Sequence, residues 1–102
     1  MKKGENSPSL RVVWDAGARP EEVRLGEPVL VGRRRRCDVS LLWDGRVSRE
    51  HCRIVPRGGA WFVEDLRSTA GTRVSGCPGP TGPLCPGARI HVGGCVLHVR
   101  AA

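Results

Sequence analysis

Short runs in which apolar and polar residues alternate recur along the whole chain, and they constrain its fold more than any other feature. In "LRVVW", Leu10, Val12 and Trp14 fall on one face. Similar runs follow at residues 22–26, 28–32, 37–42, 51–56, 61–66, 72–74, 88–92 and 95–99. Glycine and proline separate them, and no 11-residue window keeps a helical apolar stripe. The sequence therefore predicts an all-β sandwich.

The length of 102 residues is that of one domain. Residues 1–8, "MKKGENSP", are polar and without periodicity, so we expect a disordered lead followed by one domain over residues 9–101. No apolar run approaches 18 residues, and no charged segment precedes an apolar one at the N-terminus. The sequence thus predicts neither a membrane span nor a signal peptide.

Five cysteines, an odd number, accompany this missing signal and indicate a reducing, cytoplasmic location with all five as free thiols. Cys77 and Cys85 flank a loop and would pair only under oxidation. No Cys-x-x-Cys pair exists, and the histidines complete no zinc spacing. We therefore expect no metal and no cofactor.

The net charge of +7 is concentrated in the middle of the chain. Residues 33–73 hold ten arginines and five acids, a net charge of +5. They open with Gly32 followed by four arginines, Arg33 to Arg36. Such a field attracts anionic partners.

Three segments of this basic region would meet at one end of a sandwich, where loops converge on a common rim. Their candidate side chains are Arg33, Ser48, Arg49 and Thr69. A phosphate group carries about −1.5 to −2 charges and three acceptor oxygens. Arginine offers two parallel donors, and hydroxyl and backbone N–H groups add others. The set therefore predicts a small phosphate site.

The ordered motifs resemble the forkhead-associated domain family. They are "GR" at 32–33, "CDVSL" at 37–41, "VSREH" at 47–51, "DLRSTAGTRVSG" at 65–76 and "LCPGARIHVG" at 84–93. The resemblance extends over residues 10–100. It implies an eleven-stranded β-sandwich that binds phosphothreonine peptides through loops at one end, with no catalytic residues.

Each site role is carried over from this resemblance. Arg33 would clamp the phosphate, and Ser48 would donate its hydroxyl and its backbone amide. Arg49 and Thr69 would add contacts to phosphate or peptide. His51 would brace the binding loops without touching ligand. Three glycines, Gly32, Gly71 and Gly76, would serve backbone geometry.

Three positions depart from the family pattern. Ala70 stands where the family has an asparagine that fixes the peptide backbone beside the phosphothreonine. Ser75 replaces a second asparagine, and Ala88 replaces an acidic residue. The change at Ala70 predicts weakened phosphopeptide affinity with an unchanged fold.

The resulting interpretation is a phosphothreonine-recognition module whose partner is the product of a Ser/Thr kinase in a bacterial cytoplasm. Two alternatives remain: a degenerate scaffold that binds a protein without phosphate, and a basic nucleic-acid-binding domain. Nucleic acid is not the expected partner, because only 4% of the residues are aromatic and base stacking needs exposed rings. Membrane binding is not expected either. Ser48, His51 and Asp65 can be written as a catalytic triad, but no nucleophile elbow or Walker motif accompanies them.

Overall fold

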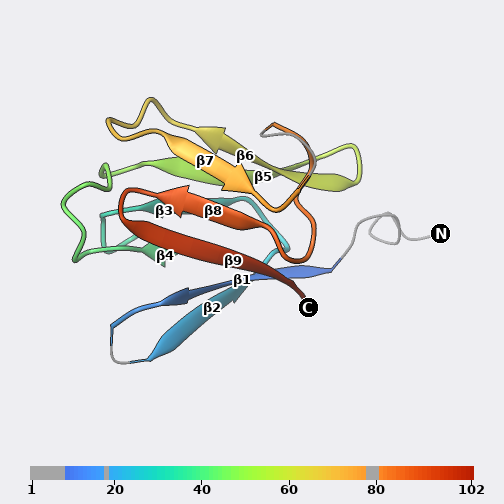
Figure 1. The fold of residues 1–102 in the computed structure, drawn as a ribbon, viewed down its shortest axis with the longest axis horizontal. Coiled ribbons are helices and arrows are strands. Elements are labelled where there is room, and N and C mark those ends of the chain that lie inside the picture. Colours follow the sequence, from blue (N-terminus) through green and yellow to red (C-terminus); the bar gives the residue numbers. More distant parts are fainter. Residues whose placement is uncertain (1–8, 18, 78–80) are drawn as a thin grey trace.

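Nine strands in two sheets make up the computed structural model of the chain, which describes residues 9–17, 19–77 and 81–102 (Figure 1). The strands are β1 (Leu10–Asp15), β2 (Pro20–Arg24), β3 (Val29–Gly32), β4 (Val39–Ser40), β5 (Cys52–Arg57), β6 (Ala60–Asp65), β7 (Thr72–Ser75), β8 (Arg89–Val92) and β9 (Cys95–Ala101). The order β2-β1-β9-β8-β7 forms a five-stranded sheet, and β4-β3-β5-β6 forms a four-stranded one.

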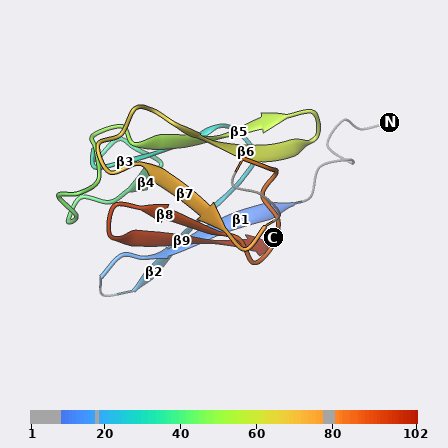
Figure 2. The same cartoon turned by 45° about the horizontal axis from the view of Figure 1, so that its top comes forward.

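The two sheets stack as layers, as the turned view in Figure 2 shows. Neighbouring strands are antiparallel except for β3 and β4, which pair in parallel with Val31 opposite Val39. The β5–β6 hairpin turns at Gly58 and Gly59. Both residues have a positive φ, a backbone conformation that glycine adopts without strain. The predicted all-β sandwich is confirmed.

The core lies between the sheets and consists of the inward-facing positions of the alternating runs. Leu10, Val12 and Trp14 of β1 are buried, as the alternation predicts. Ile54 of β5 and Leu97 of β9 are fully buried on the facing layers. Because successive strand residues point to opposite faces, the intervening residues form the two outer surfaces of the sandwich.

The expected count of eleven strands is not confirmed, because the described residues contain nine. The nine alternating runs each overlap one observed strand, whereas the count of eleven came from the family resemblance alone. Between β4 and β5 the backbone bonds locally: Asp44 N donates to Leu41 O and Val47 N to Asp44 O. These turns use donors that a further strand in this segment would have needed.

The loops that carry the predicted binding residues gather at one end of the sandwich, on the left in Figure 1. The β3–β4, β4–β5 and β6–β7 loops and the β8–β9 hairpin lie there, while the start of β1 and the C-terminus lie towards the other side. The expected disordered lead, residues 1–8, falls outside the described residues, and the domain over residues 9–101 stays a prediction. No helix long and apolar enough to cross a membrane occurs in the described part of the chain.

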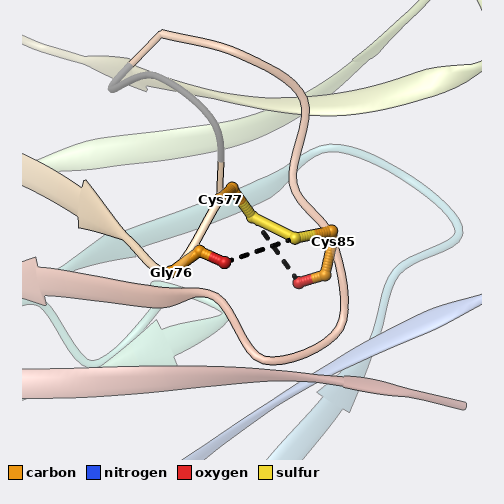
Figure 3. Close-up of a disulfide and its surroundings, with 3 residues drawn as sticks. All are labelled: Gly76, Cys77 and Cys85. Carbon is orange, nitrogen blue, oxygen red and sulfur yellow. Dashed lines mark hydrogen bonds between the residues drawn. A yellow bond between two sulfur atoms is a disulfide. The ribbon is translucent and has the colours of Figure 1, made fainter.

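A disulfide between Cys77 and Cys85 closes the β7–β8 loop, at the end of the molecule away from the binding loops (Figure 3). The prediction of five free thiols is therefore wrong for these two residues. Their Cα atoms are 6.2 Å apart, within the usual range for a disulfide. The tight turn at Gly76, with φ +86°, sets this approach, and sequence alone does not reveal connectivity. The Cys85 sulfur lies 3.6 Å from the Gly76 carbonyl oxygen, and the Cys77 sulfur lies 3.9 Å from the Cys85 carbonyl oxygen. Disulfide sulfurs carry no hydrogen, so these are contacts and not donated hydrogen bonds.

The other three cysteines are free thiols. Cys37 and Cys52 are buried and Cys95 is half-buried. Desolvation raises the pKa of Cys52 to about 12. At Cys95, desolvation and then the Asp44 carboxylate raise the pKa to about 11. Both remain protonated near neutral pH, so neither is a reactive thiolate.

We expect thiol labelling of the protein, denatured without reductant, to find three thiols per chain instead of five. Adding reductant before labelling should raise the number to five. Closing a loop of this length stabilises the fold by roughly 2–3 kcal/mol through the lost freedom of the unfolded chain. Five labelled thiols without reductant would contradict the Cys77–Cys85 pairing.

Candidate functional site

A hollow of about 470 Å³ lies where the predicted binding loops meet, and it contains every residue that the sequence assigned to ligand contact. Its lining consists of Arg33, Gly45, Arg46, Val47, Ser48, Arg49, Thr69 and Ala70. The sequence missed the contribution of Gly45, Arg46 and Val47. Three arginines and two hydroxyls around one shallow hollow suit a phosphate or a similar anion.

Arg33 is fixed at the mouth of this hollow by contacts to the neighbouring loop. Its backbone N–H is shared between the carbonyl oxygens of Ser48 and Arg49, at 3.0 and 3.1 Å. Its side-chain Nε donates to the Val47 carbonyl at 2.8 Å. The terminal nitrogens of the exposed guanidinium remain available to a ligand. This preorganisation lowers the entropy cost of binding an anion.

Gly32 permits the close packing behind Arg33. A Cβ at this position would collide with the carbonyl oxygen of Arg49. Gly71 in the β6–β7 loop has a φ of +81°, which favours glycine. Gly76 has a positive φ as well, but it lies at the disulfide end of the sandwich and does not shape this hollow.

His51 is fully buried and joins the two loops that flank the hollow. Its Nδ1 accepts the Ser48 backbone N–H at 3.0 Å, and its Nε2 lies 2.8 Å from the Gly71 carbonyl oxygen. Because a carbonyl only accepts, Nε2 carries the hydrogen in this bond and Nδ1 is the accepting nitrogen. The position of His51 fits the bracing role expected of it.

The arrangement corrects one detail of the expected role of Ser48. Its backbone N–H is engaged by His51, so it is not available to a phosphate. The Ser48 hydroxyl oxygen accepts the Thr69 backbone N–H at 3.1 Å. Accepting that bond leaves the hydroxyl hydrogen free to donate into the hollow. Ser48 therefore offers a side-chain donor only.

The β6–β7 loop is held by Asp65 at its start. Asp65 accepts the Ser68 N–H at 3.1 Å and the Thr72 hydroxyl at 2.6 Å. The Ser68 hydroxyl oxygen accepts the Gly71 N–H at 2.9 Å. Burial alone would raise the pKa of Asp65, but the hydrogen bonds from Ser68 and Thr72 outweigh it and the pKa is lowered. The loop that presents Thr69 and Ala70 is thus ordered before any ligand binds.

Asp44 ties the β4–β5 loop to the β8–β9 hairpin, a role that the sequence did not reveal. Its carboxylate accepts the Arg46 N–H at 2.9 Å, the Arg46 side chain at 3.2 Å and the Gly94 N–H at 2.7 Å. The Arg46 N–H, with help from Gly94, outweighs burial and lowers the pKa to about 2. Because the pKa lies below its ordinary 3.8, this anchor is complete above that value and is lost as the pH falls towards 2.

Within residues 9–17, 19–77 and 81–102 no cluster of three His, Cys, Asp or Glu side chains suits a metal ion. A second hollow of about 460 Å³ is lined by residues of β1 and β9, together with Pro20 and the exposed Trp43. It holds none of the predicted binding residues.

Fold and site together define a class of protein: an all-β sandwich whose loops present an ordered, arginine-lined hollow. Comparison with known proteins agrees. A model of the family described as "FHA domain" matches residues 29–93. The chain is 38% identical over 93 residues to the FHA domain-containing protein FhaB of Mycolicibacterium smegmatis and 34% identical over 93 residues to FhaB of Mycobacterium tuberculosis. Both alignments cover 87% of this chain and 58% of the relative, so the chain spans little more than half the length of these bacterial relatives.

Solved structures give the same result. One, from a structural and functional analysis of phosphothreonine-dependent FHA domain interactions, has a TM-score of 0.76 and 30% identity, covering 92% of this chain and 97% of that one. The FhaA FHA domain, complexed with the intracellular domain of Rv3910, has a TM-score of 0.75 and 31% identity, covering 90% and 100%. The chain belongs to the forkhead-associated (FHA) domain family.

Proposed function

We propose that this chain is a non-catalytic module that recognises phosphothreonine in a partner protein. The observation that carries the proposal is the convergence of Arg33, Ser48 and Thr69 on one ordered hollow. One arginine fork and one free hydroxyl hydrogen provide charge-assisted donors for a phosphate. A structurally similar FHA domain engages in phosphothreonine-dependent interactions, which supports the choice of phosphothreonine.

Catalysis has less support, because His51 is not positioned as a base. Both of its ring nitrogens are occupied, one by the Ser48 backbone and the other by the Gly71 carbonyl. Neither reaches the Ser48 hydroxyl, so the three residues Ser48, His51 and Asp65 form no relay. The domain acts by binding.

The partner in this proposal is a threonine-phosphorylated protein, which implies a Ser/Thr kinase in the same compartment. We place the interaction in the cytoplasm, where kinases have ATP. Because Cys77 and Cys85 are paired, the cysteines do not add support for a reducing compartment. Affinity is weakened, since Ala70 lines the hollow without an amide to hold the peptide backbone.

Isothermal titration with three forms of one peptide tests the proposal. We expect the phosphothreonine form to bind, the phosphoserine form to bind roughly fivefold more weakly, and the unphosphorylated form not to bind. The serine penalty follows from one lost methyl group, worth up to about 1 kcal/mol when buried. Equal, weak heats for all three peptides would remove phosphate recognition and favour a scaffold that binds protein without phosphate.

A further inference from the structure

The outer face of the five-stranded sheet carries a concentration of positive charge that the proposed phosphate site does not use. Its inward positions, such as Ile90 and Leu97, are buried, so their neighbours in the strands point outward. The outward arginines are Arg11, Arg24, Arg73, Arg89 and Arg100. Two histidines, His91 and His98, lie on the same face.

Like charges lie directly opposite one another across these strands. Arg11 of β1 is opposite Arg24 of β2 on one side and Arg100 of β9 on the other. Opposed like charges destabilise a sheet. Only Arg11 has an acidic partner on this face, Glu22 at 3.0 Å. Among the described residues no carboxylate lies within 4 Å of the other four arginines, so the face is not neutralised by its own chain.

The pKa of His91 is lowered by its surroundings on this face. Burial lowers its pKa, and the positive charges of Arg73, Arg89 and His98 lower it further. Its Nε2 lies 3.0 Å from the Ser75 hydroxyl oxygen, which fixes the ring beside the two arginines. Arg73 lies opposite His91 in the neighbouring strand, and Arg89 lies two residues before His91. The two arginine charges, with the fixed His91 ring beside them, therefore form a cluster that a bound anion would stabilise.

A hollow of about 310 Å³ extends from Arg73 and His91 of this cluster to the phosphate site. It is lined by Ala70, Gly71, Thr72, Arg73, His91 and Gly93. Ala70 also lines the phosphate hollow, so the two sites adjoin at this residue. Arg73 follows Ala70 by three residues, a span of at most about 11 Å in an extended chain. A peptide needs only three or four residues to reach from one site to the other.

We infer that the Arg73, Arg89 and His91 cluster is a second anion site, which takes acidic residues that flank the phosphothreonine of the same partner. The inference rests on the proposed function, because the phosphothreonine places the acidic segment at Ala70. Glutamate and aspartate suit exposed arginine forks. A nucleic acid fits less well, since β7, β8 and β9 contain no Trp, Tyr or Phe side chain on which bases could stack.

Three phosphothreonine peptides with one core sequence test this inference by titration. One has neutral flanks, one has a block of glutamates before the phosphothreonine, and one has the block after it. We expect one of the two acidic peptides to bind roughly three- to tenfold more tightly than the neutral peptide, in keeping with two exposed ion pairs. The gain should shrink as salt is added.

A pair of charge-matched variants locates the effect. In the double variant Arg73→Gln and Arg89→Gln, we expect the acidic advantage to disappear while the neutral phosphopeptide binds as before. The control, Arg35→Gln with Arg36→Gln, removes the same charge from the β3–β4 loop and should keep the advantage. Both variants change exposed side chains, so circular dichroism should match that of the parent.

Each other outcome overturns the inference in a distinguishable way. If the acidic phosphopeptides bind no more tightly than the neutral one, the second site is rejected and phosphothreonine recognition is left intact. The same holds if the tighter binding of the acidic peptide is lost only in the control variant. Failure of all three peptides rejects both. A single-stranded oligonucleotide that binds wild type more tightly than the acidic peptides, and loses binding in the Arg73→Gln and Arg89→Gln variant, rejects a protein ligand for this face.

Discussion

Replacing Arg33 with alanine is expected to weaken phosphopeptide binding by at least about a hundredfold. The side chain is already fixed by the Val47 carbonyl, and its two terminal nitrogens can each donate to a phosphate oxygen. Charge-assisted hydrogen bonds contribute about 1.5–3 kcal/mol each, so losing two removes roughly 3–6 kcal/mol. Titration of wild type and Arg33→Ala with one phosphothreonine peptide measures the loss.

The neighbouring arginines provide the control for this result. Changing Arg34, Arg35 and Arg36 together to alanine removes more charge but should keep most of the affinity. None of the three lines the hollow, and the Arg34 guanidinium lies 3.9 Å from the Glu50 carboxylate. A nucleic-acid arm would give the reverse order, with the triple change dominant and a steep dependence on salt. A triple variant that fails on peptide while Arg33→Ala still binds would show that another arginine holds the phosphate.

The fold was predictable because burial follows a period of two along the strands. Leu10, Val12 and Trp14 are recognisable in sequence, and all three are buried in the structure. The strand count could not be taken from the family, because strand length depends on local turns such as the one that Asp44 organises. The run at residues 37–42 marks where β4 lies, but the sequence does not reveal that only two of its residues, Val39 and Ser40, form the strand.

The components of the candidate site were predictable, but their hydrogen bonds were not. Arg33, Ser48 and Thr69 come from three separate loops, and motif order was enough to place them together. The use of the Ser48 amide by His51 depends on a buried ring orientation that spacing does not encode. The Cys77–Cys85 pairing was also not predictable from spacing, because it depends on how a turn brings two chain segments together.

The departure at Ala70 leads to the second large effect, a gain of function. Ala70 is exposed, lines the phosphate hollow and has no side chain that can hydrogen-bond a peptide. Among the described non-glycine residues only Arg67 has a positive φ, so the backbone at position 70 accepts asparagine without strain. Ala70→Asn should tighten phosphopeptide binding roughly five- to a hundredfold, through two amide hydrogen bonds of about 0.5–1.5 kcal/mol each.

A size-matched control separates hydrogen bonding from mere contact. Ala70→Leu adds a similar volume without donors or acceptors, so its affinity should stay close to that of the parent. All three proteins need the same peptide, the same salt and equal melting temperatures. Equal gains in both variants would attribute the effect to apolar contact. No gain in a folded Asn variant, whose parent binds phosphopeptide, would mean that the peptide crosses the rim without passing Ala70. Tighter binding by asparagine alone would identify the natural chain as a weakened phosphothreonine reader, in which one missing amide sets the affinity while Arg33 and Ser48 retain the phosphate contacts.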